Sequence, residues 1–248
     1  MAEPQPCKQP LLIAVDAAIS PASTSVHRGE EVCALRTAPA DQHTDAWLQP
    51  AIDECLGQLG IELPEIDGFA VTVGPGRFTG IRVGLATCLG LAAPRCLPVI
   101  AVLTLEALAD VGRARATWVV PCLDARRGQL YAAVYHLRDA PLLPLRPVEE
   151  PIVCDLQGLA RLCSKIGEPY LVIGSGSKCL VGTSSVEPAV FSANLQTVEE
   201  TGPLSVPTGQ LAARSWSTSD PSTSRPPTPV YLRPPDIHPP RNPLAPGP

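Results

Sequence analysis

The chain has 248 residues, of which 45% are hydrophobic and 17% charged, and its formal net charge is −5. This composition allows a substantial core, which excludes wholesale disorder. The acidic balance is a poor match for a free-standing nucleic-acid binder, although a role inside a larger RNA-handling complex stays open. The longest apolar stretch, residues 83–93, is too short to span a bilayer, and no signal peptide is evident. We therefore expect a cytoplasmic protein with no membrane partner.

The first hundred residues alternate between strand and helix patterns. Apolar runs, turn residues and helical periodicity predict, in chain order, a strand at 11–15, a hairpin over 24–34, a helix over 44–60, a strand at 69–73, a helix ending near residue 93 and a strand at 99–102. This order implies an α/β layer with parallel strand pairing.

After residue 103 the pattern restarts in a smaller and less regular form. We expect a short helix opened by Thr104, strands at 117–122 and 130–135, a helix over 155–166, a strand at 170–173 and a weaker helix near 209–215. The two halves could be distant duplicates. We divide the chain into an N-terminal lobe (1–102), a smaller C-terminal α/β lobe (103–215) and a proline-rich tail (216–248), because proline fixes φ and removes backbone donors.

Side chains that could ligate a metal show no suitable spacing. The nine cysteines are scattered without a CxxC pair, which favours buried reduced thiols over a zinc site. His27, His136 and His238 are also isolated. Asp124 and Arg126 form either a polar site or a turn closed by the aspartate side chain. The sequence therefore predicts no metal, no cofactor and no catalytic set.

The segment GPGRFTGIRVG, residues 74–84, is the strongest motif, and it lies at a strand-to-helix turn. It lacks the Lys and Ser/Thr of a P-loop, and its third glycine comes one residue too late for a dinucleotide fingerprint. A generic anion site at the helix start stays open. Gly80 and Gly84 share one helical face, so that another helix or strand can approach closely. Tight internal packing is the alternative explanation of these glycines.

With this motif, the chain resembles the TsaB (YeaZ) family of bacterial proteins, which are needed for threonylcarbamoyladenosine in transfer RNA. The resemblance covers nearly the whole chain in order. It rests also on LLIAVDAA at 11–18, His43-Thr44 opening a proline-containing helix, VLTLEALA at 102–109, CLDARRGQLYAAVY at 122–135, VIGSGS at 172–177 and PVYLRPP at 229–235. Arg77 departs from the family, which usually has Ser there, and the helix before the last segment is shortened.

The resemblance implies an actin-like ATPase (ASKHA) fold with two lobes of related topology, the second smaller and degenerate. It also implies a non-catalytic subunit that binds and activates TsaD together with TsaE, and meets tRNA through that complex. The residues agree with this role: Ala17-Ala18 follow Asp16 where catalytic relatives have a phosphate-binding turn, and Trp47 stands where partner-type proteins have the second His of HxxxH, after His43. A metal- or ATP-dependent enzyme, peptidase-like or kinase-like, is the alternative.

The two N-terminal helices are the predicted partner-binding surface, because both look apolar on more than one face. The resemblance implies that they pair with the equivalent helices of TsaD in a four-helix bundle. A homodimer through the same surface is possible without TsaD. The predicted interface residues are Trp47, Leu48, Ile52, Cys55, Leu59, Gly76, Arg77, Phe78, Thr79, Gly80, Gly84, Thr87 and Leu91.

Overall fold

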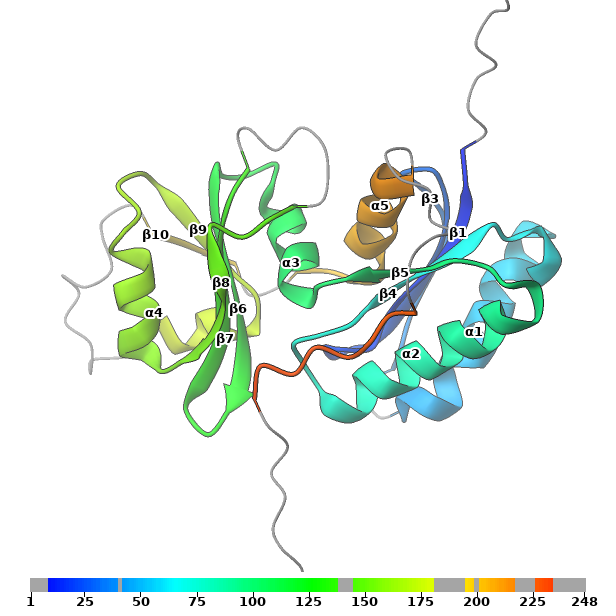
Figure 1. Ribbon diagram of the computed structural model, residues 1–248, viewed down its shortest axis with the longest axis horizontal. Coiled ribbons are helices and arrows are strands. Elements are labelled where there is room, and N and C mark those ends of the chain that lie inside the picture. Colours follow the sequence, from blue (N-terminus) through cyan, green and yellow to red (C-terminus); the bar gives the residue numbers. More distant parts are fainter. Residues whose placement is uncertain are drawn as a thin grey trace, which may run out of the picture.

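The computed structural model describes residues 9–39, 42–137, 145–180, 195–198, 201–216 and 226–233. In this part of the chain the strands form two five-stranded sheets, one in each of two lobes that lie side by side (Figure 1). Most of the predicted tail lies outside the described residues, as does His238. Among the described residues, no helix combines the length and apolar character needed to cross a bilayer.

The N-terminal sheet has the strand order β3-β2-β1-β4-β5. Its first three strands are antiparallel neighbours, and β4 and β5 join them in parallel. The elements of this half confirm the predicted order of strands and helices. They are β1 (Leu11–Asp16), β2 (Ser23–Arg28), β3 (Glu31–Thr37), α1 (Thr44–Leu59), β4 (Gly68–Thr72), α2 (Phe78–Ala92), β5 (Val99–Val102) and α3 (Thr104–Gly112).

The second sheet repeats the same topology, with the order β8-β7-β6-β9-β10. Here too the first three strands are antiparallel and the last two join in parallel. The elements are β6 (Trp118–Arg126), β7 (Gln129–His136), β8 (Glu149–Cys154), α4 (Leu156–Cys163), β9 (Tyr170–Ile173), β10 (Leu195–Val198) and α5 (Ser205–Trp216). The α/β class with two lobes of related topology is thereby confirmed.

Strands β8 and β10 were not predicted. Strand β8 begins with two glutamates and a proline and lies at the edge of its sheet, where proline costs no ladder hydrogen bond. Strand β10 has only four residues. Neither carries the apolar alternation that marks a half-buried strand.

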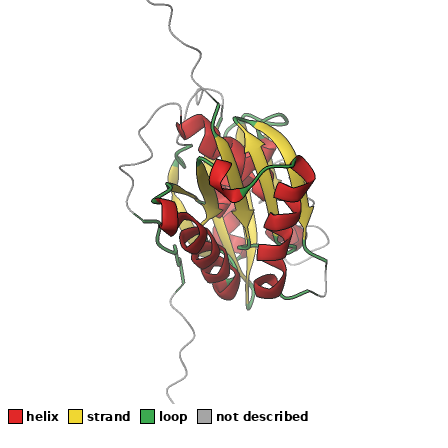
Figure 2. Ribbon diagram, turned by 90° about the vertical axis from the view of Figure 1, so that its right-hand side faces the viewer, coloured by secondary structure: helices red, strands yellow, loops and turns green. Residues whose placement is uncertain are grey.

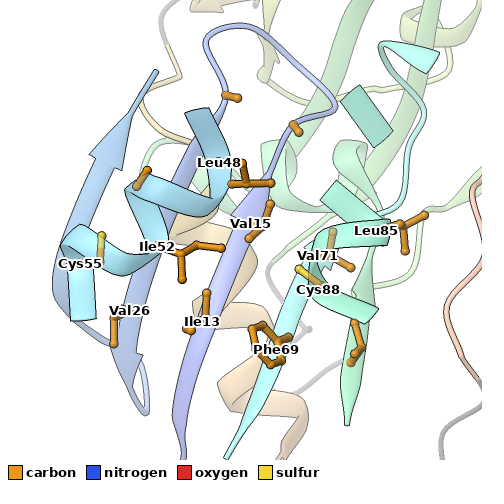
Figure 3. Packing of buried hydrophobic residues seen from close by; sticks show 14 of the residues in the cluster. Ile13, Val15, Val26, Leu48, Ile52, Cys55, Phe69, Val71, Leu85 and Cys88 are labelled. Atoms are coloured by element: carbon orange, nitrogen blue, oxygen red, sulfur yellow. The ribbon is translucent and has the colours of Figure 1, made fainter. Parts of the chain in front are cut away.

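Strand β1 is buried on both faces, which explains its unbroken apolar sequence. Ile13 and Val15 pack on one side with the inward residues of α1 and α2 (Figure 3). Leu12 and Ala14 pack on the other side with α5. Figure 2, with the N-terminal lobe toward the viewer, shows the strands lying between layers of helices.

The predicted division places residues 103–215 in the C-terminal lobe. Helix α5, at the end of this range, instead packs on β1, β2 and β4 of the N-terminal sheet. It also contacts α3, which in turn packs against the second sheet. The Arg214 side chain of α5 lies 2.8 Å from an oxygen of Asp110 in α3 and 2.7 Å from an oxygen of Glu30. Helix α5 therefore completes the first lobe and ties it to the second.

Residues 226–233, within the predicted tail, form an extended segment against the N-terminal lobe. The Val230 N–H donates to the Val73 carbonyl oxygen, with an N···O distance of 2.7 Å. Figure 1 shows this orange-red segment passing from the N-terminal lobe, beside the start of α2, toward the β6–β7 hairpin. It thus brings residues from the end of the chain to the junction of the lobes.

Candidate functional site

The glycine-rich turn between β4 and α2 is built around the segment that follows β1. A Cβ atom on Gly76 or Gly80 would collide with the carbonyl oxygens of Ala18 and Ala17 respectively. The Arg77 N–H donates to the Ala18 carbonyl oxygen over 2.7 Å. Internal packing therefore accounts for these glycines. The residue before helix α2 is Arg77, whose side chain makes no capping hydrogen bond.

Asp16 lies at the end of β1 with no exposed surface. One of its carboxylate oxygens accepts hydrogen bonds from the Thr72 hydroxyl at 2.6 Å and from the Ala18 N–H at 3.1 Å. Burial raises the pKa of this carboxyl to about 6, although these hydrogen bonds oppose the rise. Asp16 thus joins β1 to β4 and fixes the turn that follows.

The apolar stripe of α1 faces the protein's own sheet. Trp47, Leu48, Ile52 and Cys55 are buried against the core of the N-terminal lobe, and Leu59 is partly buried against it (Figure 3). This finding corrects the expectation that these side chains lie free on the surface. The physical reason is that a helix lying on a sheet buries its largest apolar residues there.

The small-residue stripe of α2 also points inward. A Cβ atom on Gly84 would lie 3.5 Å from side-chain atoms of Ala17, Val15 and Val71, so that this glycine packs on the sheet. Gly80 and Gly84 are buried, while Thr87 and Leu91 are half-buried. The expectation that the two glycines are open to another molecule's helix is corrected in the same way. Among the predicted residues of the motif, Arg77, Phe78 and Thr79 are exposed and Gly76 is half-buried.

The exposed side of these two helices carries a different set of residues. We call it the outward face; it comprises Gln49, Pro50, Asp53 and Gly57 of α1 and Ala86 and Gly90 of α2. No atom of the described chain lies within 4 Å of a Cβ placed on Gly57 or Gly90. The protein's own packing does not account for either glycine. The sequence signal that could have found this face is the pair of glycines at helix positions outside the apolar stripes, Gly57 and Gly90.

A cleft of about 570 Å³ lies between the lobes and is lined by Ile19, Arg77, Asp124, Arg126 and Lys178 among others. Asp124 closes the β6–β7 turn, where one of its oxygens accepts a hydrogen bond from the Arg126 N–H at 2.7 Å. The Arg126 guanidinium lies 4.0 Å from the other oxygen and is largely exposed. Asp124 therefore stabilises the turn, and the Arg126 side chain lies at the surface.

The described residues bring no three His, Cys, Asp or Glu side chains together in a way that could hold a metal ion. His27 is buried beside Ser25, with 2.8 Å between its Nε2 and the hydroxyl oxygen, and burial lowers its pKa to about 4. His136 packs on Trp118, with ring centroids 4.4 Å apart. These two histidines are far apart in the fold, in β2 and β7.

Comparison with known proteins finds one matching family model and several relatives that share the name TsaB. Residues 38–143 match a family model described as TsaD, tRNA N6-adenosine threonylcarbamoyltransferase. The "tRNA threonylcarbamoyladenosine biosynthesis protein TsaB" of Bacillus subtilis is 27% identical over 144 residues, which cover 58% of this chain and 63% of the relative. The protein of the same name from Escherichia coli is 34% identical over 127 residues, covering 50% and 54%.

Solved structures share the fold. A crystal structure of a Pseudomonas aeruginosa protein described as similar to peptidase YeaZ has a TM-score of 0.73 at 22% identity, covering 90% of this chain and 100% of that one. The structure of YeaZ from the same species gives a TM-score of 0.69 at 20% identity, with the same coverage. The chain is thus similar in sequence to proteins named TsaB and in fold to YeaZ structures. The matched segments span 63% and 54% of the two TsaB relatives named above.

Proposed function

We propose that the chain is a non-catalytic subunit of the machinery that forms threonylcarbamoyladenosine next to the anticodon of tRNA. In this role it binds TsaD and, together with TsaE, holds TsaD in its active arrangement. Contacts made only in that arrangement would raise its population. Sequence similarity to TsaB proteins supports the pathway, and the match of residues 38–143 to the TsaD family model supports a pairing of related lobes.

The observation that carries the proposal is the pair of exposed glycines on the outward face. A glycine within a helix costs about 1 kcal/mol relative to alanine, and the described chain gains no packing from Gly57 or Gly90. Small residues at a helix crossing let the two axes approach to about 8–10 Å. The outward face therefore suits close packing against two helices of a partner, which is the arrangement that the family resemblance implies for TsaD.

The non-catalytic character is supported by the surroundings of Asp16. One of its carboxylate oxygens, Oδ1, is engaged by Thr72 and Ala18, and the carbonyl oxygens of Ala17 and Ala18 fill the space beside the glycine turn. Phosphate binding at such a turn needs backbone N–H groups that point outward, and the Arg77 N–H is already taken by Ala18. The alternative, an enzyme of the same superfamily, would need this position to bind phosphate or metal.

The test is assembly of the purified full chain with TsaD from the same organism. We expect Gly57→Leu and Gly90→Leu to lower the affinity for TsaD by at least about tenfold, because a leucine side chain would hold the helices apart. Gly167→Leu is the matched control, since it adds the same side chain at another exposed glycine without neighbours within 4 Å. Size exclusion with light scattering measures assembly, and thermal unfolding checks each fold.

Normal assembly by both leucine variants would place the interface elsewhere. Assembly of the wild type with itself but not with TsaD would favour the homodimer. ATP turnover by the isolated chain, lost in Asp16→Ala, would revive the enzymatic alternative. Formation of modified tRNA by TsaD and TsaE, with and without this chain, then tests whether the bound subunit activates the reaction.

A further inference from the structure

Two aromatic rings lie exposed where the tail segment meets the start of α2. Phe78 and Tyr231 have ring centroids 5.0 Å apart and are 40% and 38% exposed. They are two of the three large apolar side chains that the described residues expose. A soluble domain normally scatters such residues singly, so that a pair held in contact indicates a binding surface.

Arg82 completes this group. Its guanidinium carbon lies 3.7 Å from the centre of the Phe78 ring, and its Nε donates to the Tyr231 hydroxyl oxygen over 3.0 Å. Phe78 and Arg82 come from α2, and Tyr231 follows Arg82 by 149 residues in the chain. The three side chains hold one another in place. The result is a fixed platform of two rings and a planar cation, whereas an isolated exposed ring would be free to rotate.

Three more arginines surround the platform. A hollow of about 380 Å³ beside Phe78 and Tyr231 is also lined by Arg126, Arg127 and Arg233, and no carboxylate lines it among the described residues. Asp124 closes the turn that carries Arg126, and one of its oxygens lies 4.0 Å from the Arg126 guanidinium. Four arginine side chains, including Arg82, thus gather at one place in a chain whose net charge is −5.

The backbone at this hairpin does not call for arginine. Arg126 and Arg127 have φ angles of 67° and 56°, in the left-handed region where glycine, asparagine and aspartate are favoured. Each non-glycine residue in that region adds strain, and such residues cluster at functional sites. The turn conformation therefore does not explain the arginines at these two positions, which indicates a role for their side chains.

We propose that this arginine–aromatic surface, formed by Phe78, Arg82, Arg126, Arg127, Tyr231 and Arg233, binds RNA. Guanidinium groups pair with phosphate oxygens, and aromatic rings or guanidinium planes stack against unpaired bases. An acidic protein partner would pair with the arginines, but such pairing does not explain the exposed aromatic rings. The inference rests on the proposed function for the identity of the RNA, a tRNA with unpaired loop bases. Because the chain has a net charge of −5, we expect the surface to bind RNA more tightly within the complex with TsaD than in the chain alone.

The experiment measures binding of fluorescein-labelled tRNA to the assembled complex of the full chain with TsaD, by anisotropy at several salt concentrations. We expect the double variant Arg126→Glu/Arg127→Glu to weaken binding by at least about tenfold and to lower the salt slope of log K by about 1.5, because two phosphate contacts are lost. Arg115→Glu/Arg161→Glu is the control; it makes the same charge change at two other exposed arginines.

Phe78→Leu separates stacking from charge, since it keeps an apolar side chain but removes the ring. We expect this variant to weaken binding by about fivefold or more with an unchanged salt slope. Unlabelled oligouridylate should displace the tRNA from the wild-type complex more effectively than polyglutamate of equal charge. Thermal unfolding of every variant confirms that the fold is intact.

Equal competition by polyglutamate, or unchanged tRNA binding by the arginine variant, would overturn the inference. Loss of TsaD from the complex in the arginine variant but not in the control would assign the surface to TsaD binding instead. Failure of the wild type to bind TsaD at all would refute the proposed function. The chain alone is then titrated with oligouridylate, and unaltered binding by the arginine variant would refute the RNA surface separately.

Discussion

Asp16 is a carboxyl group with no solvent exposure at the end of β1. Burial disfavours its ionised form, while hydrogen bonds from Thr72 and Ala18 favour it, and burial prevails because the pKa is raised to about 6. The folded state therefore holds its proton more tightly than the unfolded state, whose aspartate has an ordinary pKa of 3.8. Between these two values the folded protein binds more protons, so that its stability falls as pH rises.

This linkage predicts the behaviour of Asp16→Asn, which stays neutral at every pH and can still accept the Thr72 hydrogen bond. The stabilising contribution of protonated Asp16 is fully present below about pH 4 and is lost as pH rises through about 6. The variant should therefore gain up to about 3 kcal/mol relative to the wild type between pH 4 and pH 8. Urea unfolding across this range measures the difference.

The comparison with Asp53→Asn, an exposed position on α1, accounts for the loss of one carboxylate from the surface. A difference between wild type and Asp16→Asn that stays constant with pH would show that the carboxyl is not buried as described. The sequence already placed Asp16 at a strand end. It could not supply the raised pKa, because the burial that raises it arises only when the folded chain covers the end of β1.

Helices α1 and α2 each have a face whose role the sequence did not resolve. Periodicity predicted their existence and nearly their bounds, because the apolar positions recur at helical spacing. It could not separate the face that covers the sheet from the face that we propose for a partner, since both carry small or apolar residues. In the structure the larger side chains, such as Ile52, face the sheet, and the glycines Gly57 and Gly90 face outward.

The two kinds of glycine on α2 lead to opposite predictions. At Gly84 a Cβ meets three side chains at ordinary contact distance, 3.5 Å. Alanine there should raise the free energy of unfolding by about 0.5–1 kcal/mol, because it restricts the unfolded chain and improves helix propensity. Leucine there should lower it by about 1–3 kcal/mol, because the core beside Val15 and Val71 has no room for three further carbons.

Urea unfolding of Gly84→Ala and Gly84→Leu measures these changes, and TsaD binding is measured on the folded fraction. The inward assignment predicts that TsaD affinity is unaltered in both variants. If Gly84→Leu kept wild-type stability but lost TsaD, the buried face of α2 would instead be the interface.

At the scale of the whole molecule, the two lobes repeat one strand order but exchange their last helices. Helix α3, from the first repeat, packs against the second sheet, and α5, from the second repeat, covers the first sheet. The sequence suggested that the halves could be duplicates, and the common topology of the sheets agrees. It gave no indication of the exchange, because the position of a helix on one sheet or the other depends on contacts distant in sequence, such as Arg214 with Asp110.

This exchange predicts different effects for two truncations. A chain ending at residue 204 lacks α5 and leaves Leu12, Ala14 and Ala70 of the first sheet uncovered, so that we expect loss of cooperative unfolding and aggregation. A chain ending at residue 216 keeps α5 and loses only the tail contacts, including the Val230–Val73 hydrogen bond, so that it should unfold cooperatively at a slightly lower temperature.

Calorimetry and analytical size exclusion compare the two truncated chains with the full chain. The chain ending at residue 216 also lacks Tyr231 and Arg233, and should therefore bind TsaD normally while its complex binds tRNA more weakly. This combination separates folding from recognition within one protein, because α5 supports the sheet and the segment beyond it supports the arginine–aromatic surface. A stable, cooperative chain ending at residue 204 would contradict the exchange, since it would mean that the first lobe closes its core without α5.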